Sequence, residues 1–192
     1  MRLFVAVELP DAVRDVIAAG LGRLKRDQPS ARWVRPDGMH LTLKFLGERP
    51  EPFVAQLDLA AAAALATLPA ASVRLGGGGF FPNDRHPRVA WVGGEGAGLV
   101  RWAEAVDDAA ASLGAEREAR RFALHLTLAR LERPWGAQPV EHFRVEVGKW
   151  RFPEFAAREA VLVRSELTPA GPVYTALRRW RAAVGGGDGD GA

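Results

Sequence analysis

The tetrapeptide His-Leu-Thr-Leu occurs twice in this chain, at His40–Leu43 and again at His125–Leu128. Both copies stand in apolar surroundings that favour a β-strand. Residues two apart in a strand point to the same face, so each copy places an imidazole beside a hydroxyl and turns its leucines the other way. Two of the four histidines of the chain lie in these copies. The repeat therefore predicts two matching strands that present two histidines and two threonines to a shared cleft.

The first half of the chain alternates between strand and helix patterns. Residues 2–9 are rich in Val, Leu and Phe and predict a strand, and apolar residues at helical spacing predict a helix over 11–26 with Asp11 as its N-cap. The further expected elements are a short strand and turn at 33–38, the first motif strand at 39–46, and an alanine-rich helix from about 53 to 68, closed by Pro69.

The second half carries a similar mixture. We expect a strand pair at 72–80 and 88–92 around a turn at 82–87, and a glycine-rich connector between the halves at 93–98. The remaining expected elements are a helix at 99–113 ended by Gly114, the second motif strand at 122–131, and strands near 140–149, 159–166 and 172–180. The tail 185–192 has almost no apolar side chains and is expected to be disordered.

One motif copy in each half predicts an α+β fold of two similar lobes. We expect a single bilobal domain over residues 1–184, with a pseudo-twofold axis, flanking helices and a central cleft. Hairpin-like strand pairs favour antiparallel or mixed sheets over a doubly wound parallel sheet.

Bulk composition excludes several classes of protein. The 192 residues are 48% apolar and 26% charged, with a net charge of +3 and no cysteine, which rules out disulfides and thiolate chemistry. No run approaches the roughly 18 apolar residues of a membrane span, and the N-terminus does not have the pattern of a signal peptide. We therefore expect a cytoplasmic protein, with a monomer as the plainest state.

Paired imidazoles and hydroxyls suit phosphodiester hydrolysis without a metal. A neutral imidazole can take a proton from water while an imidazolium gives one to the leaving alkoxide, and each transfer contributes roughly 10² to 10⁴ in rate. Threonine hydroxyls can donate hydrogen bonds to the phosphate oxygens. Two histidines with hydroxyl companions do not make a zinc ligand set, and no Gly-x-Ser-x-Gly motif is present. We therefore expect neither a metal nor another cofactor.

Several motifs have plainer interpretations. A single strand histidine can simply fill a partly buried sheet position, but the repeat argues against this for His40 and His125. His86 and His142 have no threonine two residues later and are interpreted as structural or surface groups. The run Gly76–Gly79 lacks the ending and the helix of a phosphate-binding loop.

These residues resemble the 2H phosphoesterase family, and within it the bacterial and archaeal RNA 2′,3′-cyclic phosphodiesterases, also called 2′-5′ RNA ligases. The resemblance covers residues 2–180 in order. One departure is Leu124, where the family often has proline. The matching stretches are Arg2–Pro10, Trp33–Pro36, His40–Glu48, Phe81–Pro82, Pro87–Gly93, His125–Arg130 and Ser165–Tyr174.

The resemblance implies metal-independent hydrolysis of RNA 2′,3′-cyclic phosphate ends, or of cyclic nucleotides, to a 2′-phosphate. It implies that His40 is the general acid for the leaving O3′ and His125 the general base for water. Thr42, Thr127 and Arg130 would hold the phosphate. Strict alternation turns Arg130 away from the cleft, so a bulge or a strand end just after Leu128 is needed to re-aim it.

Three further residues are weaker candidates for binding substrate. Lys44 shares the strand parity of His40 and Thr42, although it fits a solvated strand-edge lysine equally well. Phe45 and Phe81 could stack on a base at the rim of the cleft, or could be core residues.

Two other functions stay open. One is the reverse reaction, which joins a 2′,3′-cyclic phosphate end to a 5′-hydroxyl through a 2′-5′ linkage. The other is a non-catalytic protein that binds RNA ends; intact histidines and threonines in both copies argue against it.

Overall fold

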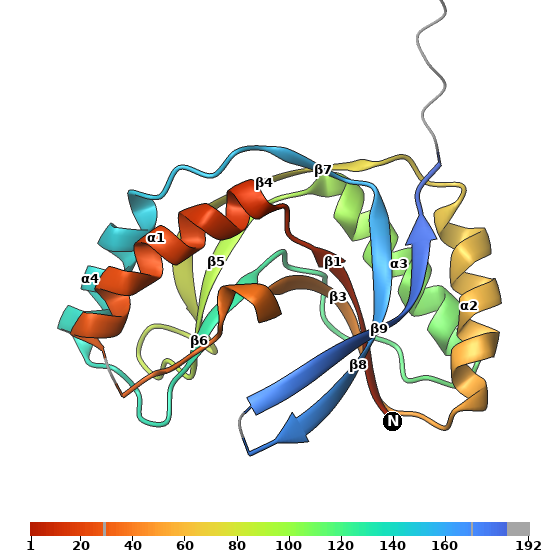
Figure 1. The fold of residues 1–192 in the computed structure, drawn as a ribbon, viewed down its shortest axis with the longest axis horizontal. Helices are drawn as coiled ribbons and strands as arrows, with labels where there is room; N and C mark the ends of the chain where they lie inside the picture. Colours follow the sequence, from red (N-terminus) through yellow and green to blue (C-terminus); the bar gives the residue numbers. More distant parts are fainter. Residues whose placement is uncertain (29, 170, 184–192) are drawn as a thin grey trace, which may run out of the picture.

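The computed structural model describes residues 1–28, 30–169 and 171–183, so the expected disordered tail lies outside the described residues. Figure 1 shows two groups of strands, each backed by helices. In chain order the elements are β1 (Arg2–Glu8), α1 (Asp11–Asp27), β2 (Arg32–Trp33), the 3₁₀ helix η1 (Pro36–Gly38), β3 (His40–Glu48), α2 (Pro52–Leu65), β4 (Ala71–Phe81), β5 (Val89–Glu95), α3 (Ala97–Ser112), β6 (Leu126–Arg130), α4 (Ala137–Gly148), β7 (Phe155–Ala157), β8 (Glu159–Thr168) and β9 (Gly171–Arg181).

The first sheet joins strands from the two ends of the chain. It is antiparallel, with the order β3-β1-β8-β9. Helix α3 contacts β3 and helix α2 contacts β9, so both helices cover one face of this sheet. The other face carries a small buried cluster of its own, formed by Phe4, Ala6, Val161 and Val163. Burial on both faces explains why β1 is an uninterrupted apolar run.

The second sheet is also antiparallel, with the order β2-β6-β5-β4-β7. Helix α4 packs on β4, and α1 contacts α4 beside it, as Figure 1 shows. Val13, Ile17, Leu21 and Leu24 bury one face of α1 at helical spacing, as the sequence predicts. The expected α+β fold of two antiparallel sheets with flanking helices is confirmed.

The two lobes do not correspond to the two halves of the chain. Strands β8 and β9 return to the first sheet, while α1 from the N-terminal half packs with α4 of the second lobe. The residues expected to connect the halves also have another role. Gly93 and Gly94 belong to β5, and only Gly96, at the start of α3, lies between elements.

Three local expectations are wrong. Residues 140–149 form most of helix α4, because Val140, Phe143 and Val147 are buried together at helical spacing. The second motif strand is shorter than expected and begins at Leu126, so His125 lies directly before it. Asp11 is the first residue of α1 and makes no side-chain cap; Pro10 holds the N-cap position.

Candidate active site

Both motif histidines are held by the same backbone contact. Nδ1 of His40 lies 3.0 Å from the carbonyl oxygen of Gly38, and Nδ1 of His125 lies 2.8 Å from that of Ala123. A carbonyl oxygen only accepts hydrogen bonds, so each Nδ1 carries the hydrogen. In the neutral rings Nε2 is then the basic nitrogen, available to accept or deliver a proton at a substrate.

The two motif strands lie next to each other. Cα atoms of β3 come within 8 Å of Cα atoms of β6, so the strands that carry the two motifs contact each other although they belong to different sheets. Below, the motif site means His40, Thr42, His125 and Thr127. All four side chains are partly accessible, whereas the leucines beside the threonines are buried, as the alternation predicts.

A β-bulge follows the threonine in both copies. In β3, Ala6 pairs with Thr42 and Val5 with Lys44, which leaves Leu43 as the extra residue. In β6, Trp91 pairs with Thr127 and Ala90 with Ala129, which leaves Leu128 as the extra residue. A bulge shifts the alternation by one position. The fifth residue after each histidine, rather than the fourth, therefore shares the face of the histidine and threonine.

The bulge makes the expectation for Lys44 wrong. Lys44 lies on the buried face of β3, where its side chain is 3% exposed and its Nζ donates to Oδ1 of Asp107 and to the carbonyl oxygen of Glu116, 2.9 Å away. Burial alone would raise the pKa of Asp107, but hydrogen bonds from Lys44 and from the Glu118 N–H lower it. Lys44 thus ties β3 to α3 and to the segment that leads to His125.

The bulges at Leu43 and Leu128 also determine which way Phe45 and Arg130 face. Phe45 pairs with Phe4 on the His40 face of β3 and is 59% exposed, so it is not a core residue. Arg130 gains the face of Thr127 through the bulge at Leu128, which is the bulge that its proposed role requires. Its contact with phosphate stays a prediction.

His40 is packed among aromatic rings. Its imidazole stacks on Phe4 with a centroid distance of 4.5 Å and meets the edge of Tyr174 at 5.3 Å. Burial lowers the pKa of His40 to about 4; the hydrogen bond to Gly38 opposes this shift, and the positive charge of Arg14 adds to it. In the free protein at neutral pH, His40 is therefore uncharged.

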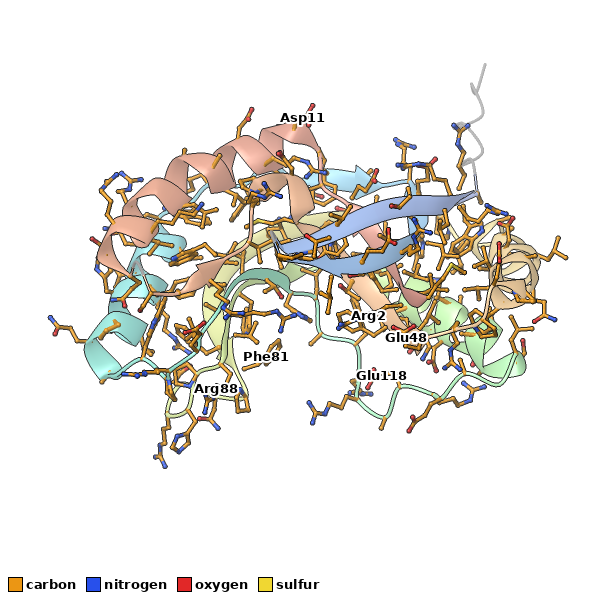
Figure 2. All side chains as sticks on the ribbon, turned by 60° about the horizontal axis from the view of Figure 1, so that its bottom comes forward. Arg2, Asp11, Glu48, Phe81, Arg88 and Glu118 are labelled. Atoms are coloured by element: carbon orange, nitrogen blue, oxygen red, sulfur yellow. The ribbon has the colours of Figure 1, made fainter. Side chains whose placement is uncertain are left out.

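His125 has a different neighbour. The ring of Phe81 meets the imidazole of His125 edge to face, with a centroid distance of 4.9 Å. The ring of Trp91 packs against Phe81 with a centroid distance of 5.3 Å. Figure 2 shows Phe81 at the end of β4, close to Arg88 on the adjoining turn. The structure thus brings Phe81 to the second histidine, whereas Phe45 contacts Phe4, the ring on which the first histidine stacks.

Tyr174 is the residue that motif reasoning missed. It lies on β9, is 38% exposed, and contacts both Phe4 and His40 edge-on. Its only signal in the sequence is its place at the end of the stretch Ser165–Tyr174, far from either motif. Pairing of β9 with β8, and of β8 with β1, carries it to His40.

Other features of this region bear on alternative chemistry. Gly76–Gly79 lie within strand β4, so they form no phosphate-binding loop. Among residues 1–28, 30–169 and 171–183, no three histidine or carboxylate side chains gather as metal ligands would. No helix in these ranges is long and apolar enough to cross a bilayer.

Comparison with known proteins agrees with the paired motifs. A sequence profile of the family described as LigT like phosphoesterase matches residues 7–91 and 94–174. The chain belongs to this family of LigT-like, 2H phosphoesterases. The resemblance drawn from the motifs is confirmed, and the matched ranges contain all four residues of the motif site.

Several relatives carry the same name. A Thermus thermophilus protein named RNA 2′,3′-cyclic phosphodiesterase is 40% identical over 94% of this chain and 89% of its own length. A protein of the same name from Archaeoglobus fulgidus is 35% identical over 93% of this chain and 98% of its own length.

Solved structures share the LigT-like fold. A crystal structure from Thermus thermophilus superposes with a TM-score of 0.76 at 36% identity, covering 94% of this chain and 97% of that one. Escherichia coli LigT without ligand gives a TM-score of 0.73 at 28% identity, covering 95% of this chain and 98% of that one.

Proposed function

We propose that this LigT-like phosphoesterase hydrolyses RNA 2′,3′-cyclic phosphate ends, leaving a 2′-phosphate, with His40 and His125 as its acid and base and without a metal. The observation that supports it most is the matched pair of histidines, each anchored through Nδ1 to the carbonyl oxygen two residues earlier, at the starts of two strands that contact each other. The relatives named RNA 2′,3′-cyclic phosphodiesterase support the substrate class.

The proposed step is an in-line displacement at phosphorus. Nε2 of His125 takes a proton from water as the water oxygen bonds to phosphorus. The bond from phosphorus to O3′ breaks on the opposite side, and O3′ receives a proton from Nε2 of His40. Thr42, Thr127 and Arg130 donate hydrogen bonds to the non-bridging oxygens, which carry the charge. Opening of the strained ring assists the step.

In the proposed mechanism, substrate binding promotes the protonation of His40. Because burial lowers the pKa of His40 to about 4, few molecules carry this proton in the free protein at pH 7. An anionic phosphodiester beside Nε2 favours the imidazolium and raises this pKa. Substrate binding and loading of the general acid are thus linked in the proposed mechanism.

In-line geometry also assigns a side to the nucleoside. O2′ and O3′ belong to one ribose, so the ribose lies with the leaving O3′ on the His40 side, and water attacks from the His125 side. On the His40 side the exposed rings of Phe45 and Tyr174 offer surfaces on which a base can stack. A crystal structure of Escherichia coli LigT with 3′-AMP, 27% identical with a TM-score of 0.73, supports a nucleotide ligand.

The deciding experiment is product identification. Purified protein in EDTA is incubated with a short RNA that ends in a 2′,3′-cyclic phosphate, and the terminal phosphate is located. We expect a 2′-phosphate, and turnover by His40→Ala or His125→Ala that is lower by about 10² to 10⁴. A 3′-phosphate would reverse the acid and base sides. Turnover only after a metal is restored, or tight binding without turnover, would overturn the proposal in favour of a metal enzyme or a binder of RNA ends.

A further inference from the structure

A connecting segment, residues 113–125, runs from the end of α3 to the start of β6 and ends at His125. Residues 113–125 contain neither helix nor strand. The first of them complete the end of α3, where the N–H of Ala115 donates to the carbonyl oxygen of Ala110. The position of His125 therefore depends on what holds the rest of the connecting segment.

A buried ion pair holds the middle of this segment. Nζ of Lys44 donates to the carbonyl oxygen of Glu116, 2.9 Å away, and the backbone N–H of Glu118 donates to Oδ1 of Asp107 at 3.0 Å. Lys44 donates to the same Oδ1, so the pair and its two bonds to the segment form one connected network.

This network is the main polar attachment of the segment. In the part of the chain that the structure describes, each hydrogen bond from residues 116–122 to another element ends on Lys44, Asp107 or Asp108. The bond to Asp108 comes from the exposed side chain of Arg117, and exposed ion pairs contribute little. The Lys44 side chain is 3% exposed, and hydrogen bonds shielded from water are stronger.

Lys44 also connects the two motif copies. It lies on β3, four residues after His40, and the bulge at Leu43 turns it to the opposite face of the strand. The strand that carries the first histidine therefore holds, from its reverse side, the segment that carries the second. The spacing of the two imidazoles depends on this contact.

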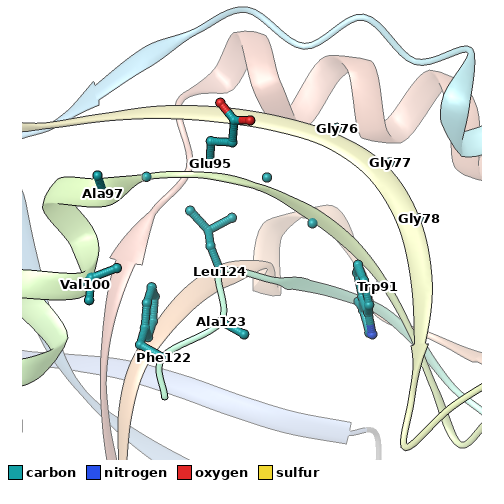
Figure 3. A pocket seen from close by; sticks show the side chains of 13 residues that line it. Gly76, Gly77, Gly78, Trp91, Glu95, Ala97, Val100, Phe122, Ala123 and Leu124 are labelled. Carbon is teal, nitrogen blue, oxygen red and sulfur yellow. The ribbon is translucent and has the colours of Figure 1, made fainter.

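The connecting segment borders a hollow near its end. Figure 3 shows Phe122, Ala123 and Leu124 among the residues that line it, and its volume is about 680 Å³. Much of its wall is backbone, because Gly76–Gly78 of β4 and Gly93–Gly94 of β5 carry no side chains. Side chains of these strands do not fill the space, so the segment has room to shift if the buried network is lost.

We propose that Lys44 and Asp107 are positioning residues, which fix His125 relative to His40 by anchoring the connecting segment. The inference rests on the proposed function, because it needs His125 to act as the base. Neither Lys44 nor Asp107 touches the substrate in this proposal. Their effect on the reaction passes through the position of the second imidazole.

Loss of the anchor should affect the chemical step more than substrate binding. A displaced Nε2 of His125 is poorly aligned with the attacking water, and a misplacement of about 1 Å can cost roughly 100-fold in rate. Thr42, Thr127 and Arg130 lie within β3 and β6 and keep their strand pairings. We therefore expect a lower kcat with little change in KM.

The first variant keeps stability and removes the anchor. Lys44→Met with Asp107→Leu replaces the buried pair by apolar side chains, which should leave resistance to urea near that of wild type. Both hydrogen bonds to the connecting segment are lost. On an RNA with a 2′,3′-cyclic phosphate end we expect kcat to fall by about 10- to 100-fold, with KM within about threefold of wild type.

The second variant does the reverse. In Asp107→Asn the amide oxygen can still accept from Lys44 and from the Glu118 N–H, but the buried ammonium loses its counter-charge. This protein should be less resistant to urea, while kcat stays within about threefold of wild type. Arg117→Ala is the matched control, because it removes exposed ion pairs from the same segment and should change neither quantity.

A further measurement asks whether the effect passes through His125. In a His125→Ala background, Lys44→Met with Asp107→Leu should lower the residual single-turnover rate by less than about threefold, because the group that the pair positions is absent. An equal loss in both backgrounds would indicate a general disturbance of the fold and overturn the inference.

The remaining contrary results also have distinct meanings. Recovery of kcat in the apolar double variant, or a kcat that falls with stability in Asp107→Asn, would make the pair purely structural. A rise in KM at unchanged kcat would place its effect on substrate binding and overturn the inference as well. Circular dichroism checks folding, and either variant alone decides if the other does not fold. Absence of hydrolysis by wild type overturns the proposed function itself.

Discussion

The two His-Leu-Thr-Leu copies share a sequence and a local geometry but have different surroundings. Each histidine gives its Nδ1 hydrogen to the carbonyl oxygen two residues earlier, and each strand bulges at the second leucine. His40, however, stacks on Phe4 and touches Tyr174, whereas His125 meets the edge of Phe81. Identical local sequence thus sets orientation, and neighbours from distant strands set how readily the first imidazole takes up a proton.

Removing either imidazole should have the largest effect. His40→Ala and His125→Ala are each expected to lower kcat by about 10² to 10⁴, because each removes one proton transfer. The double variant should lose much less than the product of the two, since either loss already disables the step. Single-turnover rates on a cyclic-phosphate RNA measure this, with circular dichroism as the control for folding. Full activity in either single variant would contradict the two-histidine mechanism.

The fourth residue after each histidine differs between the copies in charge and size. Lys44→Met leaves Asp107 without its buried partner and is expected to reduce the free energy of unfolding by about 3 kcal/mol, the low end for a broken buried pair, because Arg117 still lies 3.5 Å from Asp107. Lys44→Met with Asp107→Leu should recover most of this loss. Urea unfolding of wild type, Lys44→Met and the double variant measures these changes. A Lys44→Met variant as stable as wild type would show that the Lys44–Asp107 pair does not stabilise the fold.

The buried position of His40 should make stability depend on pH. Its pKa is lowered to about 4, below the unfolded value near 6.5, so between these values the unfolded chain binds more protons and stability rises with pH. Above pH 6.5 the imidazole is neutral in both states, and the free energy of unfolding is at its full value. As the pH falls toward 4, the free energy of unfolding decreases by on the order of 3 kcal/mol. Urea unfolding of wild type and His40→Gln from pH 4 to 7 measures this slope; parallel curves would show that His40 is not shielded from water.

The fifth residue after each histidine should separate phosphate from base recognition. Arg130→Ala is expected to lower kcat/KM by about 10- to 100-fold, the range for a lost hydrogen bond to a charged group, on any cyclic-phosphate substrate. Phe45→Ala should raise KM about fivefold, and only when the substrate carries a base. Kinetics with a matched abasic substrate check this, with Arg130→Lys as a partial rescue. Equal losses by Phe45→Ala on both substrates would mean that Phe45 has only a structural role.

Local patterns predicted a strand or a helix correctly when one interpretation dominated. The apolar spacing of α1, the alternation of the first four residues of β3 and the glycine just past α3, Gly114, which has a positive φ of 79°, all match the structure. Residues 140–149 fitted both periods. Packing favours the helix, because the ring of Phe143 packs against the rings of Phe80 and Trp135, with centroid distances of 4.9 Å and 6.1 Å.

The candidate site was predictable in part. The two histidines and two threonines follow from a repeated pattern, and the need for a bulge before Arg130 follows from parity. The matching bulge at Leu43, which exchanges the faces of Lys44 and Phe45, has no signal in single-strand alternation, because a bulge is a property of the register between two strands.

By itself, the sequence determined the residues of the candidate site, the main helices and strands, and the family, because these depend on contacts and spacings within a few residues. Only the tertiary structure decided that β8 and β9 bring Tyr174 to His40, that Lys44 is buried against Asp107, and that this pair holds the segment before His125. These features arise from strand order, register and the contact of α3 with β3, each set by packing between segments far apart in the chain.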